Sequence, residues 1–238
     1  MSCLIRSRGL ASDFCVLALP VLGQNTFMPN VFRQGEHICT IYETAEEQLA
    51  TAATYLADGL RAGERALYVT ESTAALVRFN DALNDLGVDS AAELKRGALV
   101  ESTHAEVHLV DGRFECERMM RLLNEAVESA LNDGFAGLRT CGDMSWLLKQ
   151  PPGATQVVEY EALLNQFFHD IRGAGMCQYD CRRLPAPIVD RALATHSSVI
   201  LEGLHKSNPF HRPYLPSLNA VAQSFDLDWK LSELRRRA

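Results

Sequence analysis

The feature of this sequence that most constrains its fold is a regular alternation of short apolar segments with longer amphipathic ones. The short segments are rich in β-branched and aromatic residues and carry few charges, which is typical of strands buried on both faces. Strand candidates of this kind lie at residues 37–42, 65–70, 98–102, 136–144, 175–180 and 198–203. Because parallel strands must be joined by long crossovers, the alternation predicts a mainly parallel sheet.

The segments between the strand candidates have apolar residues at helical spacing. These helix candidates lie at residues 44–60, 74–86, 116–131, 157–171 and 187–195. The first begins clearly, because Thr44 and Glu47 have the spacing of a capping box. We therefore predict an α/β fold, a single three-layer domain whose mainly parallel sheet is covered by helices on both faces.

The regular pattern covers residues 35–215, which we expect to form the one domain of the chain. Residues 1–34 are expected to form a poorly ordered N-terminal arm, and residues 216–238 a solvated helical tail. The arm contains an apolar run at residues 14–22 that resembles the core of a signal peptide. The run is too short to span a membrane and no cleavage pattern follows it, so Met28 is a natural alternative first residue.

Composition narrows the classes of partner. The 238 residues are 47% hydrophobic and 22% charged, which allows a sizeable core. A formal net charge of -7 argues against direct binding of nucleic acid or of an anionic membrane. The seven cysteines are irregularly spaced and form no CxxC pair, which indicates reduced thiols in a cytoplasmic protein.

Polar and aromatic residues gather where the strand candidates end. Tyr42, Asp143 and Tyr179 stand at such ends, and Trp146 follows closely. Parallel α/β sheets bind ligands beyond the carboxyl ends of their strands, so these residues are candidates for a ligand pocket. Aromatic residues at this edge are equally compatible with ordinary structural packing.

His37 and Cys39 lie two residues apart on the first strand candidate, so both side chains point to one face of the sheet. Their spacing alone favours a histidine and a cysteine that fill the core. The alternative is a site in which an imidazole and a thiol contact a metal or a polarisable ligand. Cys141 and Cys177 would add sulfur if their strands were neighbours. Because spacing brings only two residues together, we predict no metal site, and the cofactor stays unknown.

Several catalytic and nucleotide-binding motifs are absent from the sequence. No Gly-Lys-Ser/Thr occurs, and Glu43 and Glu47 place carboxylates where the first helix would otherwise receive a phosphate. GxSxG and HExxH are absent as well, so we predict that the protein is not an enzyme. His104 and His108 lie in a stretch typical of a loop or strand, and we expect them at the surface.

Six stretches together resemble one known family. They occur in the order GEHICTIYET, AGERALYVTES, LRTCGDMSWLL, VVEYEALLNQF, CQYDCRRLP and THSSVILEG, over about residues 35–212. This ordered set is similar to the MEDS family, the methanogen/methylotroph, DcmR-type sensory domain. The resemblance implies a degenerate relative of KaiC- and RecA-like ATPases without a phosphate loop. It also carries the motif positions of the family over to His37, Cys39 and Tyr42.

The function that this resemblance implies is a cytoplasmic sensory and regulatory domain that binds a small ligand, such as a simple hydrocarbon derivative. Its signal would pass through a protein partner in transcription or signal transduction, a kinase or a transcription regulator. We expect no direct contact with nucleic acid or membrane, and a homodimer is compatible with this role. The expected ligand-binding residues are His37, Cys39, Tyr42, Asp143, Trp146 and Tyr179.

Two other functions remain open at this stage. One is a KaiC/RecA-like nucleotide-binding protein with an altered phosphate loop. The other is a structural interaction domain without a small ligand. A pocket at the strand ends would favour a ligand-binding protein, whereas strand ends filled by side chains would favour the interaction domain.

Overall fold

The computed structural model describes residues 32–212 and 227–237, and the expectations for residues 1–31 lie outside the described residues. Within residues 32–212 the chain forms a seven-stranded sheet in the order β3-β2-β4-β5-β1-β6-β7. Neighbouring strands are parallel except for β6 and β7, which are antiparallel. The strands are β1 (His37–Tyr42), β2 (Arg65–Thr70), β3 (Leu99–Thr103), β4 (Leu138–Asp143), β5 (Gly173–Asp180), β6 (Ser198–Leu201) and β7 (Leu204–Ser207).

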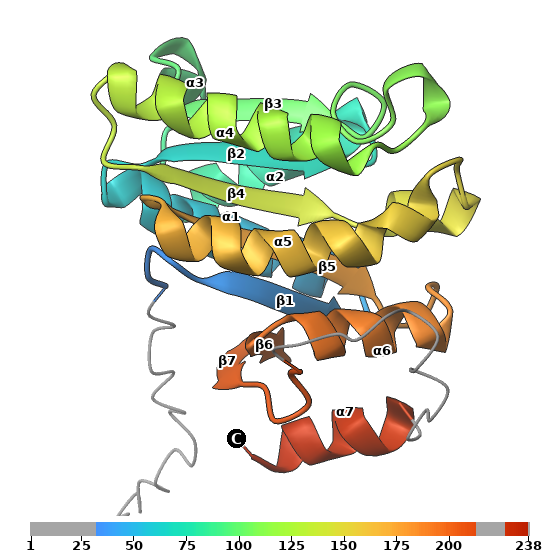
Figure 1. Ribbon diagram of the computed structural model, residues 1–238. Coiled ribbons are helices and arrows are strands. Elements are labelled where there is room, and N and C mark those ends of the chain that lie inside the picture. The colour runs from blue at the N-terminus through green and yellow to red at the C-terminus, as the bar shows by residue number, and fades with distance from the viewer. Residues whose placement is uncertain (1–31, 213–226, 238) are drawn as a thin grey trace, which may run out of the picture.

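Helices cover both faces of this sheet (Figure 1). Figure 1 shows α4, α5 and α6 in front of the sheet, and α1 and α2 behind it. The helices are α1 (Ala45–Arg61), α2 (Thr73–Asp85), α3 (Ser90–Lys95), α4 (Cys116–Asn132), α5 (Val157–Asp170), α6 (Ala186–Thr195) and α7 (Leu227–Arg236). Short 3-10 turns lie at Val110–Gly112, Ser145–Lys149 and Ala154–Gln156. The predicted three-layer α/β fold is therefore confirmed. Among the described residues, no helix combines the length and apolar character that a membrane crossing needs.

Two short elements that the sequence pattern does not predict, α3 and β7, are also present. The helix α3 begins after Asp89, whose side chain accepts a 3.0 Å hydrogen bond from the Ala92 N–H. Six residues are too few for a helical periodicity to be recognised. The strand β7 follows a two-residue turn in which Glu202 and Gly203 both have positive φ, the geometry of a tight hairpin. Because Glu202 stands where such turns usually have Asn, Asp or Gly, the turn is not predicted from the sequence.

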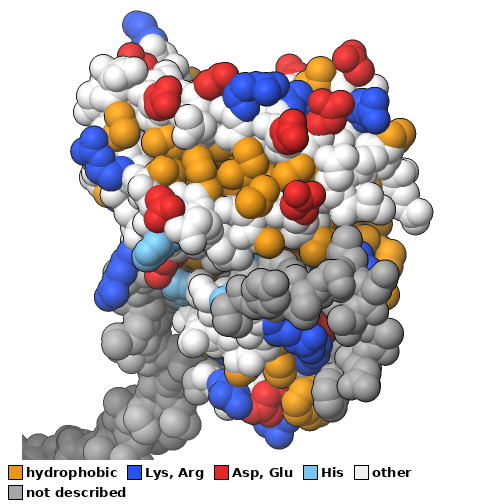
Figure 2. Space-filling view, in the orientation of Figure 1, with side chains coloured by type: hydrophobic (Ala, Val, Ile, Leu, Met, Phe, Trp, Pro, Cys, Tyr) orange, Lys and Arg blue, Asp and Glu red, His pale blue; other side chains and the backbone are white. Residues whose placement is uncertain are grey.

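The sheet separates two apolar cores, and the side chains of β1 alternate between them. Cys39 and Ile41 lie in the core under α4, α5 and α6, whereas Ile38 lies in the core under α1 and α2. The sequence predicts this alternation from the two-residue period of a strand. Figure 2 shows further apolar side chains gathered on the surface between α4 and α5, and the shallow groove there is lined in part by Met119 and Leu122.

The front core depends on a close approach between α5 and the backbone of β5. A Cβ atom at Gly175 would collide with the ring of Phe168, so only glycine lets this ring rest on the strand. The same ring lies 5.7 Å from the imidazole of His37, measured between ring centroids. Gly175 therefore sets the height of α5 above the sheet, and with it the position of the side chains that α5 presents to the sheet.

The back face contains a buried ion pair between Arg139 of β4 and Glu64, which precedes β2. The Arg139 Nε atom lies 2.5 Å from a carboxylate oxygen of Glu64, and both side chains are 3% exposed. The guanidinium also lies over the ring of Tyr55. Gly59 of α1 leaves the room that the arginine occupies, because a Cβ atom there would meet its side chain. This contact joins α1 to the sheet.

The C-terminal helix α7 packs against the domain, although the sequence leads us to expect a solvated tail. Leu231 and Leu234 are buried in the front core, which is why the helix is not free in solvent. Lys230 forms a buried ion pair with Asp190 of α6. The remainder of the expected tail, residues 216–226, lies outside the described residues.

Candidate functional site

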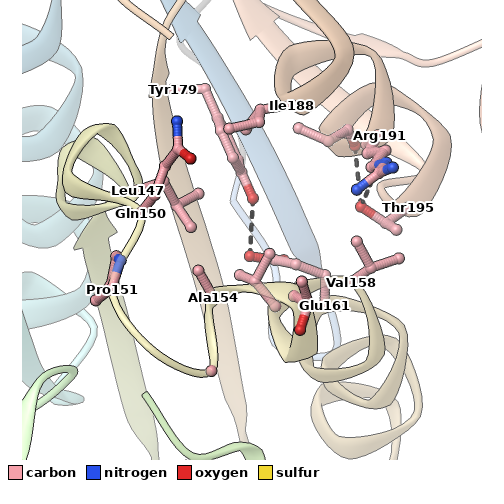
Figure 3. A pocket seen from close by; sticks show the side chains of 14 residues that line it. Leu147, Gln150, Pro151, Ala154, Val158, Glu161, Tyr179, Ile188, Arg191 and Thr195 are labelled. Atoms are coloured by element: carbon pink, nitrogen blue, oxygen red, sulfur yellow. Dashed lines mark hydrogen bonds between the residues drawn. The ribbon is translucent and has the colours of Figure 1, made fainter. Parts of the chain in front are cut away.

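A cavity of about 390 Å³ lies between α5, α6 and residues 145–156, on the front face of the sheet near the carboxyl end of β5 (Figure 3). Its walls are mostly apolar and include Leu147, Pro151, Ala154, Val157, Val158, Ile188 and Ala192. Polar side chains contribute at a few points, namely Gln150, Thr155, Glu161, Tyr179, Arg191 and Thr195. An apolar hollow with a few polar groups is the usual form of a small-molecule site.

The Glu161 carboxylate faces the Tyr179 hydroxyl across the base of this cavity (Figure 3). The hydroxyl donates a hydrogen bond of 2.8 Å to Oε1 of Glu161, and both residues are 2% exposed. Glu161 lies on the face of α5 that also buries Leu164 and Phe168, three and seven residues further on. The helix therefore carries a carboxylate at a position where its pattern calls for an apolar residue.

Behind the cavity, Glu161 belongs to a buried cluster that we define as His37, Glu161, Cys177 and His196. Oε2 of Glu161 lies 3.2 Å from Nε2 of His37 and 3.2 Å from Nε2 of His196. The Cys177 sulfur lies 3.6 Å from Nε2 of His37. One potential ligand atom from each of these residues lies within 4.8 Å of all the others, and each residue is buried.

The two imidazoles of the buried cluster are oriented by their outer nitrogens. Nδ1 of His37 lies 3.2 Å from the side-chain oxygen of Asn165. The Asn165 amide nitrogen donates to the carbonyl oxygens of Glu161 and Thr195, at 3.2 and 2.8 Å, and so fixes which end of the amide faces His37. Nδ1 of His196 lies 2.7 Å from the Ala192 carbonyl oxygen. Both histidines therefore present Nε2 to Glu161.

Burial and mutual charge change the acidity of the cluster. Burial alone would raise the pKa of Glu161, but the imidazoles of His196 and His37 together hold that pKa below its usual range. Burial and the neighbouring His196 lower the pKa of His37. Burial and the Glu161 charge raise the pKa of the Cys177 thiol. At neutral pH Glu161 is therefore ionised and the Cys177 thiol is protonated.

The structure places only part of the predicted ligand site at this cavity. Tyr179 lines the cavity, and His37 reaches it indirectly through Glu161. Cys39 is fully buried and lies in register with Cys177 on the neighbouring strand, but it is not a member of the buried cluster. Cys177 and Cys141 are expected to add sulfur only if their strands are neighbours of β1. The pairing of β1 with β5 meets this condition for Cys177, whereas Cys141 lies in the core on the opposite face.

Tyr42 and Asp143 lie on the opposite face of the sheet, toward α1. The Tyr42 hydroxyl donates to Oδ1 of Asp143 at 3.4 Å, and the Ser145 hydroxyl donates to Oδ2 at 2.7 Å. Burial raises the pKa of Asp143, while the hydrogen bonds from Ser145 and Tyr42 lower it in part. A second hollow of about 80 Å³ lies beside these residues. The residues expected to form one ligand site are therefore divided between the two faces of the sheet.

Trp146 is a buried packing residue whose ring stacks on His108 and Phe114, at centroid distances of 5.5 and 4.9 Å. The expectation that His104 and His108 lie at the surface is wrong, since they are 7% and 4% exposed. The His104 N–H donates to the Thr70 carbonyl oxygen at 3.0 Å and so extends the pairing of β3 with β2. The following turn brings the ring of His108 against Gly142 of β4. Burial lowers the pKa of His104 to about 4, and burial together with His104 lowers the pKa of His108 to about 3.

Glu161, Asn165 and His196 are not among the site residues predicted from the sequence. The available signal was the position of Glu161, since a charge three residues before Leu164 and seven before Phe168 interrupts an apolar helical face. His196 gives a weaker signal, because a single histidine between a helix and a strand is ordinary. The contact of both residues with His37 depends on strand order, which residue spacing does not specify.

In the turn between β1 and α1, side-chain oxygen atoms of the turn accept hydrogen bonds from its backbone N–H groups. The Thr44 hydroxyl accepts from the Glu47 N–H at 3.2 Å, and the Glu47 carboxylate accepts from the Glu43 N–H at 2.8 Å. The predicted start of the helix at Thr44 is thus confirmed, but the Glu47 carboxylate reaches the Glu43 N–H and not the Thr44 N–H of a strict capping box. Glu43 also forms ion pairs with Arg182 and Arg235, at 3.1 and 2.7 Å. Side chains therefore occupy two N–H groups near this helix start, those of Glu43 and Glu47, and the Glu43 carboxylate adds negative charge that would repel a phosphate.

Comparison with known proteins places these observations in a family. A model of the MEDS family, described as MEthanogen/methylotroph, DcmR Sensory domain, matches residues 36–197. No curated protein sequence gives a significant match. The fold is similar to that of the KaiC-like protein PH0186 from Pyrococcus horikoshii OT3, with a TM-score of 0.49, 14% sequence identity and coverage of 71% of each chain. It is also similar to the flagellar accessory protein FlaH from Methanocaldococcus jannaschii, with a TM-score of 0.48, 14% identity and coverage of 73% of this chain and 76% of that one. Because the family model spans well over half of the sequence, this chain belongs to the MEDS family of sensory domains.

Proposed function

We propose that this protein is a non-enzymatic sensory and regulatory domain of the cytoplasm that binds a small ligand between α5 and α6. The observation that carries the proposal is the apolar cavity of about 390 Å³ with Glu161 and Tyr179 at its base. Small-molecule pockets have volumes of about 300–1,000 Å³ and combine apolar walls with a few polar groups. Membership of the MEDS family supports the sensory role.

The chemistry of the walls indicates the class of ligand. Ile188 and Val158 offer apolar contact from the two helices, and the segment 145–156 adds Leu147 and Pro151. The Glu161 carboxylate would orient a ligand that has a single hydrogen-bond donor, such as the hydroxyl of a short alcohol. A simple hydrocarbon derivative fits this arrangement, as the family resemblance leads us to expect.

The same helices offer a route from the ligand to a protein partner. Ile188 and Arg191 line the cavity, while Asp190 on the same helix pairs with Lys230 of α7. A ligand that moved α6 would therefore move α7, and the outer surface of α7 would present the change to a kinase, a transcription regulator or a second copy of the chain. The outward side chains of α7 include the exposed Trp229, a residue type that is common in protein interfaces.

Ligand binding is tested by native mass spectrometry of freshly purified protein and by thermal shift with short-chain alcohols, aldehydes and halogenated alkanes. The variant Ala192→Leu places a larger side chain in the cavity and should abolish stabilisation by any compound that stabilises the wild type. Ala74→Leu, an exposed substitution on α2, is the matched control and should bind normally. Absence of binding by the wild type, or full binding by Ala192→Leu, would contradict the proposal.

Nucleotide binding is the second candidate function, and the hollow beside Tyr42 is the observation that favours it. This hollow lies at the carboxyl edge of the sheet, and Arg78 and Arg183 in its wall could contact a phosphate. The same wall carries Asp143, Asp180 and Glu71, which repel anions, and the volume of about 80 Å³ is small for a nucleotide. The ligand cavity near Tyr179 therefore has the stronger support.

A further inference from the structure

The buried cluster has a donor set that suits a transition metal better than it suits an apolar core. It contains two imidazole nitrogens, one thiol sulfur and one carboxylate oxygen, all on buried side chains. Zn²⁺ binds this combination of ligands in proteins and prefers four of them in a tetrahedron. Two of the four residues, Glu161 and His196, come from the helical layer, while His37 and Cys177 come from adjacent strands.

The distances between donor atoms fit the edges of such a tetrahedron. Zinc–ligand bonds of about 2.0–2.3 Å place neighbouring ligand atoms about 3.3–3.8 Å apart. In the structure, Glu161 Oε2 lies 3.2 Å from Nε2 of each histidine, and the Cys177 sulfur lies 3.6 Å from Nε2 of His37. All four donor atoms lie within 4.8 Å of one another, so small side-chain rotations bring the remaining pairs to bonding geometry.

Two of the four inner atoms of the buried cluster are fully shielded from solvent and have no hydrogen-bond partner among the described residues. They are Glu161 Oε2 and His196 Nε2, which face each other at 3.2 Å. Nδ1 of His196 donates to the Ala192 carbonyl oxygen, so Nε2 of the neutral ring has no proton to give to the carboxylate. Buried polar atoms are normally paired, and leaving one unpaired is unfavourable. A cation between these atoms would satisfy both of them at once.

The outer atoms of the same residues are hydrogen-bonded in the way that metal ligands usually are. Histidine ligands typically donate their second ring nitrogen to a carbonyl or amide oxygen, which leaves a lone pair on the inner nitrogen. His196 contacts the Ala192 carbonyl oxygen in this way and His37 contacts Asn165, while Tyr179 holds the second oxygen of Glu161. The inner atoms are thus oriented toward one point.

We propose that the buried cluster of His37, Glu161, Cys177 and His196 is a binding site for one divalent transition-metal ion, with Zn²⁺ the best match. The Glu161 carboxylate and a Cys177 thiolate together balance the two positive charges of the ion, which makes the buried site neutral. The thiol proton is released to solvent when the metal binds. This site departs from the expectation of no metal because Glu161 and His196 come from distant parts of the sequence.

A metal in this position would hold together the layers that form the ligand cavity. His37 and Cys177 fix it to the sheet, Glu161 fixes it to α5, and His196 fixes it to the end of α6. Glu161 itself lines the cavity, as does Thr195, which precedes His196 in the chain. The inference stands apart from the proposed ligand sensing, since metal content is measured on the protein without any small molecule.

The test is elemental analysis of the full-length, tag-free protein purified with Zn²⁺ in the growth medium, expected to give one zinc per chain. Removal of zinc by a chelator followed by addition of Co²⁺ should produce a thiolate-to-cobalt charge-transfer band in the near ultraviolet. Cys177→Ala should lose this band, and His196→Gln should lower the bound metal to a small fraction. Asn165→Ala should weaken affinity by about 10–100-fold, the usual effect of removing a group that orients a ligand.

The matched control is Cys141→Ala, which removes a buried thiol from β4 on the opposite face of the sheet and should keep both the zinc and the cobalt band. Wild-type protein that contains no zinc and takes up neither Zn²⁺ nor Co²⁺ would overturn the proposal. Equal loss of metal in Cys141→Ala and Cys177→Ala would overturn it as well. If Cys177→Ala fails to fold, the wild-type metal content and cobalt spectrum still decide the outcome.

Discussion

The Tyr179 hydroxyl and Oε1 of Glu161 lie 2.8 Å apart, and their hydrogen bond joins the cavity between α5 and α6 to the buried cluster behind it. Tyr179 comes from the end of β5, whereas Glu161 comes from the middle of α5. The bond therefore crosses from the sheet to the helical layer at the base of the cavity. A change at either residue is expected to affect both the cavity and the buried cluster.

Replacement of Tyr179 by phenylalanine tests the energy of this contact. The variant leaves a buried carboxylate oxygen without its donor, so we expect the free energy of unfolding to fall by about 1–3 kcal/mol. Urea denaturation of the variant and the wild type measures the difference. Tyr55→Phe is the control, because the buried Tyr55 hydroxyl has no hydrogen-bond partner within residues 32–212 and 227–237, and its removal should cost little. Equal losses in the two variants would contradict the prediction.

The ion pair of Arg139 with Glu64 should be one of the costliest contacts to break. Arg139→Met leaves the Glu64 carboxylate buried without its partner, which typically costs about 3–5 kcal/mol. The exposed pair of Arg61 with Asp58 is the comparison, and its loss should cost under about 1 kcal/mol. Denaturant titrations of variants that lack each ion pair compare the two losses in the free energy of unfolding. A smaller loss in Arg139→Met with Glu64→Leu than the sum of the single losses would confirm direct coupling.

Acid should destabilise the protein through His104 and His108. Their folded pKa values, about 4 and about 3, lie below the unfolded value of about 6.5, so the unfolded chain binds more protons in between. The contribution of the two neutral histidines to the free energy of unfolding is fully present above the unfolded pKa. It is lost as pH falls toward the folded pKa values. Each histidine adds a slope of up to about 1.4 kcal/mol per pH unit. Urea titrations between pH 7 and pH 5 measure it, and replacing both histidines with glutamine should flatten the slope.

Millimolar ATP with Mg²⁺ is expected to leave the melting temperature unchanged. The Thr44 and Glu47 side chains occupy two of the N–H groups near the start of α1, those of Glu47 and Glu43, and the Glu43 carboxylate adds negative charge there. Binding at a hundred times the dissociation constant would add about 2.7 kcal/mol, which a thermal shift assay detects easily. A clear shift that disappears in Thr44→Ala would favour the nucleotide-binding alternative.

The sequence predicts the fold well because each main element carries its own local signal. All six strand candidates and all five helix candidates correspond to strands and helices of the structure, with ends that differ by a few residues. The two elements that the sequence pattern does not predict, α3 and β7, have weak local signals. The helix α3 has six residues, and β7 follows the Glu202–Gly203 turn without the usual Asn or Gly at its first position.

The candidate site could be predicted only in part, because it depends on which strands are neighbours. The order β4-β5-β1 brings His37 next to residues that follow it by more than a hundred positions, and no sequence spacing reports such a contact. The assumption that all strand-end residues share one pocket also overlooks the two faces of the sheet. Tyr42 and Tyr179 both end strands, yet one faces α1 and the other faces α5 and α6.

The glycine under Phe168 has a consequence for how ligand size can be altered by engineering. Because the ring already rests on the backbone of β5 at Gly175, α5 can neither move closer to the sheet nor tolerate a larger residue below it. The wall that carries Glu161 therefore cannot shift toward the sheet, and the opposite wall is the place at which the dimensions of the cavity can be changed. Exchanging the segment 145–156 between relatives, together with side chains of α6 such as Ile188, is the direct route to a receptor for a larger or smaller compound.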